Sequence, residues 1–188
     1  MGLSSRFETA LAFAARLHGE QARKGTRIPY VAHLLGVASI ALEYGADEEE
    51  AIAALLHDAV EDQGGIATAE VIERCFGERF AQIVVACSDS STLPKPPWLA
   101  RKEAYIARLE ESTPSERLVS CSDKLHNVRA ILRDYREIGD EIWGRFTADK
   151  AGVLWYYRTL ADVFLRLGPE RLSHELDRVV AELEATAG

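Results

Sequence analysis

A histidine, an adjoining aspartate and two further carboxylates lie within one short stretch of this sequence. Glu61 follows His57 by four residues, and Asp62 follows Asp58 by four. On a helix, side chains four residues apart are neighbours, with about 5–6 Å between their Cβ atoms. One surface would then present an imidazole and three carboxylates, groups that bind divalent metal ions and move protons. This stretch alone leaves open a plainer alternative, a solvated acidic helix end with a core histidine.

Two distant residues extend this candidate site. His33 has apolar neighbours, and Asp123 lies within an otherwise apolar helical pattern. Burying a charged carboxylate is costly unless it has a partner, so Asp123 indicates either a salt bridge or a metal ion. An inward His33 is likewise either a core histidine or a ligand. With His57 and Asp58, these residues form a mixed nitrogen and oxygen set that suits Mn²⁺, Fe²⁺ or Zn²⁺ with positions left for water.

The elements that must position these residues are predicted to be helices throughout. Apolar residues recur at helical spacing, and no segment alternates convincingly at period two. We expect helices over about 7–15, 31–44, 48–60, 68–76, 78–87, 98–111, 114–136, 149–167 and 170–185. Asp47 and Thr113 are expected N-caps, and Pro114 suits the first helical position. The proline-bearing segment 88–97 is expected to be a surface loop. The predicted fold class is all-α, a bundle of about eight to ten helices.

Composition and charge limit the classes of function. With 188 residues, of which 47% are hydrophobic, residues 1–188 are expected to form one domain. The net charge of -8 argues against binding a nucleic acid polymer or an anionic membrane surface. No apolar stretch is long enough to span a membrane, and the N-terminus lacks a signal-peptide pattern. Three widely spaced cysteines are read as reduced thiols, so we expect a cytoplasmic protein.

Three segments together resemble the HD-domain metal-dependent phosphohydrolases. Residues 23–33 contain Arg-Lys-Gly, Pro-Tyr and a histidine, residues 55–62 read LLHDAVED, and residues 122–129 read SDKLHNVR. Within that superfamily, the motifs are similar to those of the RelA/SpoT-type single-domain small alarmone hydrolases, which include the metazoan Mesh-type proteins. The resemblance covers about residues 13–161, and it implies an HD-domain helical bundle.

The resemblance also implies a reaction and roles for individual residues. One metal ion, usually Mn²⁺ in this family, would be held by His33, His57, Asp58 and Asp123. Glu61 and Asp62 would position and deprotonate the attacking water. The enzyme would be a Mn²⁺-dependent (p)ppGpp 3′-pyrophosphohydrolase, a phosphoric diester hydrolase that releases GDP or GTP.

The substrate contacts are implied in the same way. The residues concerned are Arg23, Lys24, Lys95, Arg101, Lys102, Asn127 and Lys150. Arg23 would stack on the guanine base, and Asn127 would contact the nucleotide near the metal. Basic patches over 16–27 and 95–102 suit a small polyanion, although ordinary solvated faces have the same composition. Pro96-Pro97-Trp98 resembles an insertion, which leaves the register of the phosphate contacts open. It is likewise open which aromatic side chain of residues 155–157 faces the substrate pocket.

Two other classes of function remain as alternatives. The same metal centre would serve an HD phosphohydrolase of another nucleotide, such as an adenosine alarmone of the ppApp type or the phosphate of NADPH. A non-catalytic binding or antitoxin-like module could keep a metal for stability. The Glu61-Asp62 pair argues against that module, because a structural site does not need these carboxylates. The sequence does not decide the base, the metal ion or whether the chain forms a homo-oligomer.

Overall fold

The computed structural model describes residues 2–88 and 96–188, and their regular structure is helical. No strand occurs in these two ranges, only an isolated antiparallel bridge between Ala22 and Pro29. The all-α prediction is confirmed. The helices are α1 Ser5–Leu17, α2 Val31–Glu43, α3 Glu48–Leu56, α4 Ala59–Asp62, α5 Ile66–Phe76, α6 Glu78–Cys87, α7 Trp98–Leu109, α8 Pro114–Ile138, the 3-10 helix η1 Gly139–Arg145, α9 Lys150–Leu167 and α10 Glu170–Ala187. Among the described helices, none is both long and apolar enough to cross a membrane.

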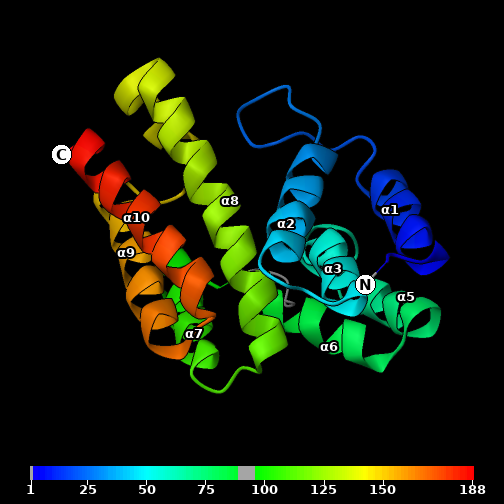
Figure 1. Ribbon diagram of the computed structural model, residues 1–188. Coiled ribbons are helices and arrows are strands. Elements are labelled where there is room, and N and C mark those ends of the chain that lie inside the picture. Colours follow the sequence, from blue (N-terminus) through cyan, green and yellow to red (C-terminus); the bar gives the residue numbers. More distant parts are fainter. Residues whose placement is uncertain (1, 89–95) are drawn as a thin grey trace.

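The longest helix, α8, divides the molecule into two packed halves (Figure 1). On one side, buried side chains of α7, α9 and α10 pack against α8 and η1. On the other side, α1 to α6 enclose a second group of buried side chains, which Val119 of α8 joins. Because α8 touches both groups, a polar residue on it can meet residues from α2 and α3 between the two halves.

The starts of α3 and α8 are fixed by the capping residues that the sequence predicts. Asp47 accepts a hydrogen bond from the backbone amide of Glu50 at 2.8 Å, and the Glu50 side chain accepts one from the Asp47 amide. Thr113 and Glu116 form the same reciprocal pair at the start of α8, with Pro114 in its first turn. Each cap satisfies amides that have no partner inside the helix, and so sets where the helix begins.

The prediction of one helix running to about Val60 is wrong. The helix breaks at His57 and Asp58, which form a turn between α3 and α4. His57 Nδ1 donates to the carbonyl of Ala54 at 2.8 Å. In a continuous helix, that carbonyl accepts from the amide of Asp58, so the histidine side chain competes with the backbone. The amide of Asp62 still donates to the carbonyl of Asp58 at 2.9 Å, so these two residues remain one turn apart.

The 3-10 helix η1 is an element that the sequence pattern did not predict. Seven residues are too few for a helical period to be recognised. Its last residue, Arg145, lies against Gly25 of the loop before α2. A Cβ atom on Gly25 would lie 2.7 Å from Cγ and Cδ of Arg145, and the φ of Gly25 is +72°. Glycine therefore allows both the left-handed turn and the close approach of Arg145.

An ion-pair cluster between α8 and α10 predicts a pH-dependent contribution to stability. Glu175 accepts hydrogen bonds from Arg178 and from Arg129, which lower the pKa of Glu175 from 4.5 to about 2. Because the pKa is lowered on folding, this contribution is present above pH 4.5 and is lost as the pH falls toward about 2. We expect Glu175→Gln to lower the free energy of unfolding by about 1 kcal/mol near neutral pH, since solvent screens the pair. Urea unfolding across this pH range measures the difference, and a difference independent of pH would contradict the prediction.

Candidate metal and catalytic site

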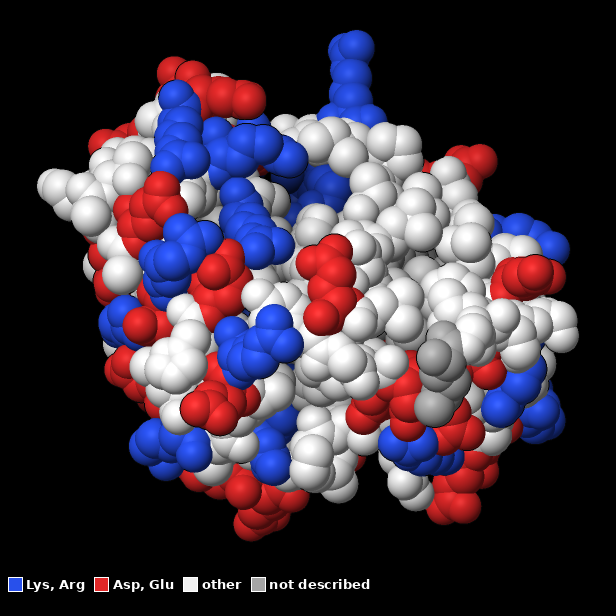
Figure 2. Space-filling view, viewed as in Figure 1, with Lys and Arg blue, Asp and Glu red and all other residues white. Residues whose placement is uncertain are grey.

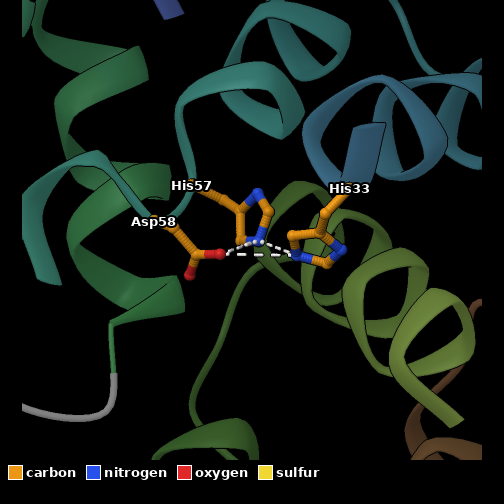
Figure 3. A group of neighbouring side chains, drawn as sticks. All are labelled: His33, His57 and Asp58. Atoms are coloured by element: carbon orange, nitrogen blue, oxygen red, sulfur yellow. Dashed lines mark hydrogen bonds and ion pairs between the residues drawn. The ribbon is translucent and has the colours of Figure 1, made fainter. Parts of the chain in front are cut away.

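Two buried histidines from different segments point toward each other near α8 (Figure 3). His33 comes from α2, and His57 follows the last residue of α3. Their Nε2 atoms lie 3.3 Å apart. Asp58 Oδ2 lies 2.9 Å from Nε2 of His57 and 3.4 Å from Nε2 of His33. These three side chains present one nitrogen or oxygen each within 4.8 Å of one another, an arrangement that could hold a metal ion.

Asp123 of α8 approaches the same point from the other half of the molecule. Its Oδ1 lies 3.2 Å from Nε2 of His33 and 3.5 Å from Nε2 of His57. The other oxygen, Oδ2, accepts a hydrogen bond from Lys124 Nζ at 2.7 Å. The structure thus brings together all four residues that the sequence analysis grouped as metal ligands, although they are separated by up to 90 positions between His33 and Asp123.

We call His33, His57, Asp58 and Asp123 the donor set. Their side chains fit a divalent metal ion. Because His57 Nδ1 donates to a backbone carbonyl, the nitrogen that loses its proton when a metal ion binds is Nε2, which faces the other donors. Ligands about 2.0–2.1 Å from a common ion lie roughly 3.0–3.4 Å from one another. The distances of 2.9–3.5 Å between these side-chain atoms are close to that spacing. Mixed imidazole and carboxylate donors suit a first-row divalent ion.

The charges of the cluster are strongly coupled. Burial alone would lower the pKa of His57, but the charge of Asp58 and hydrogen bonds to both carboxylates hold it well above its usual value. Burial opposes ionisation of Asp58 and Asp123 as well. The charge of His57 beside Asp58, and that of Lys124 beside Asp123, nevertheless hold the pKa of each carboxyl well below its usual range. Both carboxylates are therefore ionised near neutral pH and available to a cation.

Tyr30 fixes the orientation of Asp58. Its hydroxyl donates to Asp58 Oδ2 at 2.5 Å, and its ring packs edge-on against His33 with 5.4 Å between ring centroids. Burial, and then the charges of Asp58 and Asp62, raise the pKa of Tyr30, so the phenol keeps its proton. Tyr30 belongs to one of the sequence motifs, but the sequence alone indicates no role for it.

This contact predicts the effect of removing one hydroxyl group. We expect Tyr30→Phe to weaken Mn²⁺ binding by about 10-fold, because groups that orient metal ligands typically contribute that much affinity. Isothermal titration with Mn²⁺ measures the change. Tyr44→Phe, at the far end of α2, is the matched control and should leave the affinity unchanged. Equal Mn²⁺ affinities of Tyr30→Phe and the wild type would show that Asp58 binds the ion equally well without the hydrogen bond from Tyr30.

A cavity of about 170 Å³ opens beside the donor set. Its lining residues are Tyr30, Asp58, Glu61, Asp62, Cys87, Lys102, Asp123, Lys124 and Asn127. We call it the acidic cavity, because four of these side chains are carboxylates. Gln21 Nε2 donates to Asp62 Oδ2 at 2.7 Å and so orients that carboxylate. Glu61 and Asp62, the two predicted proton-transfer residues, thus line the same cavity as Asp58 and Asp123.

A second cavity, of about 200 Å³, adjoins the first and shares Tyr30 and Asn127 with it. It is lined by the loop before α2, by α8 and by η1, and its positive side chains are Arg23, Lys24, Arg133 and Arg145. We call it the cationic cavity. Figure 2 shows Lys and Arg side chains gathered around a hollow at the upper edge of the molecule, near that loop. Arg23 donates to Asn127 Oδ1 at 2.9 Å, and Asn127 donates to Asp123 Oδ1 at 2.5 Å, so the two cavities are joined by hydrogen bonds.

The remaining predicted substrate contacts fall in different places. Lys102 lines the acidic cavity, with its Nζ 4.8 Å from the centroid of the Tyr156 ring. Arg101 donates to the carbonyl of Pro96 at 3.0 Å and is absent from the described lining of both cavities. Lys150 lies elsewhere: its Nζ donates to the carbonyl of Ala187, at the end of α10. Lys95 lies outside the described residues.

Several residues that line the cavities could not be assigned from the sequence. Of the aromatic residues 155–157, Tyr157 is the one that lines the cationic cavity. The sequence does offer an indication for Lys124, because it adjoins Asp123 in an apolar helix. Arg145 had none, because long-range packing of η1 against the loop brings it to the site. Asp134 also lies there, with its Oδ2 2.6 Å from Arg145 Nη1.

Comparison with known proteins agrees with this geometry. The model of the family described as HD domain matches residues 10–154, which include every residue of the donor set. The chain belongs to the HD domain family. Residues 155–188, the rest of α9 and α10, lie beyond the matched part of the HD domain.

Two animal relatives carry the name guanosine-3′,5′-bis(diphosphate) 3′-pyrophosphohydrolase MESH1. The human protein is 38% identical over 124 residues, which are 64% of this chain and 66% of the relative. The Drosophila melanogaster protein is 35% identical over 129 residues, 67% of this chain and 69% of the relative. The alignments thus span only about two thirds of these relatives. A solved structure described as "A metazoan ortholog of SpoT hydrolyzes ppGpp and plays a role in starvation responses" matches with a TM-score of 0.80 and 26% identity, covering 97% of both chains.

Proposed function

We propose that this HD domain protein hydrolyses (p)ppGpp at its 3′ position, releasing pyrophosphate and GDP or GTP. The observation that carries the proposal is the pair of adjoining cavities, one holding the metal donor set and the other lined by cations. A nucleotide with phosphates at two positions can occupy both at once. The names of the animal relatives and of the solved structure support the same reaction.

The cationic cavity suits the nucleoside end of such a substrate. Arg23 offers a planar guanidinium that can stack on a base, and its hydrogen bond to Asn127 holds it in place. Lys24, Arg133 and Arg145 supply further positive charge for phosphate oxygens. Lys102 lines the acidic cavity and would add positive charge beside the pyrophosphate group. We retain Arg101 and Lys95 as candidate phosphate contacts, whereas the position of Lys150 gives that residue no support.

The metal ion belongs in the acidic cavity. His33, His57, Asp58 and Asp123 would hold it. We propose Mn²⁺ as the ion, since mixed imidazole and carboxylate ligands suit it. A divalent ion held there supplies Lewis-acid chemistry, which polarises a phosphoryl oxygen and makes water more acidic.

Glu61 and Asp62 carry out the proton transfer. Together they orient the attacking water and take its proton, while Gln21 holds Asp62 in position. The water oxygen forms a bond to the phosphorus that is attached to the ribose 3′ oxygen. The bond between that phosphorus and the 3′ oxygen breaks, and the proton that the two carboxylates took from the water passes to the 3′ oxygen. The products are pyrophosphate and a nucleotide with a free 3′ hydroxyl group.

We also propose a domain organisation, a cellular location and a class of partner for this activity. We infer that residues 1–188 act as one catalytic domain, because the buried side chains of both halves pack on α8. We also infer a cytoplasmic location and a small nucleotide, rather than a nucleic acid polymer or a membrane, as partner. Cys75, Cys87 and Cys121 are all free thiols, as a reducing compartment favours.

The test is a Mn²⁺-dependent hydrolysis assay with ppGpp, pppGpp, ppApp and NADPH run in parallel and the products separated by ion exchange. We expect pyrophosphate and GDP from ppGpp, lost when a chelator is added. Cleavage of ppApp or NADPH without cleavage of ppGpp would overturn the substrate but keep the metal mechanism. No turnover of any of the four, with Mn²⁺ bound, would favour a binding module.

A further inference from the structure

His33 has a second polar contact, on the side of its ring that faces away from the donor set. Its Nδ1 lies 2.9 Å from Nδ1 of His126, and the two ring centroids are 4.8 Å apart. His126 belongs to α8, three residues after Asp123. No role of His126 follows from the proposed function, which uses only the Nε2 side of His33.

The direction of this hydrogen bond follows from the other face of His33. Nε2 of His33 faces His57, Asp58 and Asp123, so it must be bare when it binds a metal ion. A neutral imidazole carries one proton, which then lies on Nδ1 of His33. Nδ1 of His33 therefore donates, Nδ1 of His126 accepts, and the proton of His126 lies on its Nε2.

We propose that His126 is a positioning residue that holds His33 in the tautomer and orientation needed to bind the metal, and that Gly36 provides the space for its ring. The inference rests on the ligand assignment in the proposed function, and it adds two residues that this assignment does not use. Metal-binding histidines commonly donate their second ring nitrogen to such an acceptor. For His57 the acceptor is the carbonyl of Ala54, and for His33 it is a side chain from α8.

Gly36 lies on α2, one turn after His33, and His126 lies over it. A Cβ atom on Gly36 would be only 2.3 Å from both Cδ2 and Nε2 of His126. Any side chain at this position would therefore displace the ring. Inside a helix, glycine costs about 0.5–1 kcal/mol relative to alanine, so the helix alone would favour alanine. The position of the His126 ring gives a reason for glycine here.

The first test compares two variants of nearly equal size and shape. His126→Asn retains an acceptor oxygen at the δ position, whereas His126→Leu has only a methyl group there. In isothermal titration with Mn²⁺ alone, we expect His126→Leu to weaken binding by about 10-fold to 100-fold. His126→Asn should keep most of the affinity. Circular dichroism of both metal-free variants checks that each is folded.

The second test fills the space that Gly36 leaves for the His126 ring. Gly36→Ala should weaken Mn²⁺ binding in the wild-type chain by displacing His126. In the His126→Ala background, the same change should have no further effect, because no ring remains to be displaced. Gly144→Ala is the control, since a Cβ atom there meets nothing within 4 Å. Because alanine has a higher helix propensity than glycine, weaker Mn²⁺ binding by Gly36→Ala would not result from a less stable α2.

Equal losses of Mn²⁺ affinity in His126→Asn and His126→Leu would overturn the inference, because ring packing and not the acceptor would then matter. Unchanged affinity in His126→Leu would overturn it as well. Either result leaves the proposed function intact, provided that the wild-type chain binds Mn²⁺ and turns over substrate. A wild-type chain that binds no divalent ion would overturn both this inference and the proposed metal centre.

Discussion

The double variant Glu61→Gln/Asp62→Asn is expected to lower kcat for ppGpp hydrolysis by about 10⁴-fold while Mn²⁺ stays bound. A positioned general base contributes about 10²-fold to 10⁴-fold, and we expect the two carboxylates to act as one unit. Both line the acidic cavity, but neither belongs to the group of donors around His33 and His57. The two changes preserve side-chain shape, and the amide oxygen introduced by Asp62→Asn would still accept the hydrogen bond from Gln21.

The measurement needs both kcat and Mn²⁺ affinity, together with a control for charge. Removing two negative charges beside a polyanionic substrate changes its attraction to the protein, whatever the chemistry. Glu70→Gln/Glu73→Gln removes two charges from exposed positions on α5 and should leave kcat unchanged. Loss of Mn²⁺ from the Glu61→Gln/Asp62→Asn protein would contradict the division between metal ligands and proton-transfer residues.

Those parts of the fold that depend on local chemistry could be predicted from the sequence. Thr113, Pro114 and Asp47 mark helix starts because capping involves residues only three positions apart. The α6 bounds Glu78–Cys87 match the prediction, since a glycine and an apolar period define them. The four donor residues could be grouped because their types, in that order, resemble a known motif, and the structure then brings them together.

Features that depend on particular side-chain contacts, local or between distant segments, could not be predicted. The break at His57 depends on a side chain that competes for a carbonyl, which an apolar period does not reveal. Lys150 was grouped with the substrate contacts from its place along the chain, but α9 begins beside the end of α10. Arg145 reaches the site only through packing of η1 against the loop before α2, and its neighbours in sequence give no sign of it. His126 lies in a site motif, but its contact with His33 depends on the packing of α8 against α2.

Among the substitutions described above, Lys124→Met is expected to lower the free energy of unfolding most. Mn²⁺ should restore part of this loss. Lys124 is mostly buried, its Nζ lies 2.7 Å from Asp123 Oδ2, and it lies 4.7 Å from the centroid of the Tyr105 ring. Removing one partner of a buried ion pair costs about 3–5 kcal/mol, because the remaining charge has no compensation. We therefore expect the free energy of unfolding of the metal-free variant to fall by about that amount near neutral pH.

The metal ion and Lys124 neutralise the same carboxylate, so their effects on stability are coupled. Oδ1 of Asp123 faces His33, and Oδ2 accepts a hydrogen bond from the ammonium group of Lys124. An ion held by the donor set would share this carboxylate with Lys124, and the two positive charges would repel each other. Saturating Mn²⁺ should therefore raise the free energy of unfolding more in Lys124→Met than in the wild type. Lys150→Met is the control, since the ion pair between Lys150 and Asp140 is exposed to solvent, and its loss should cost much less stability. If the two variants lost equal stability, or if Mn²⁺ stabilised Lys124→Met no more than the wild type, Lys124 would not be the charge partner of Asp123.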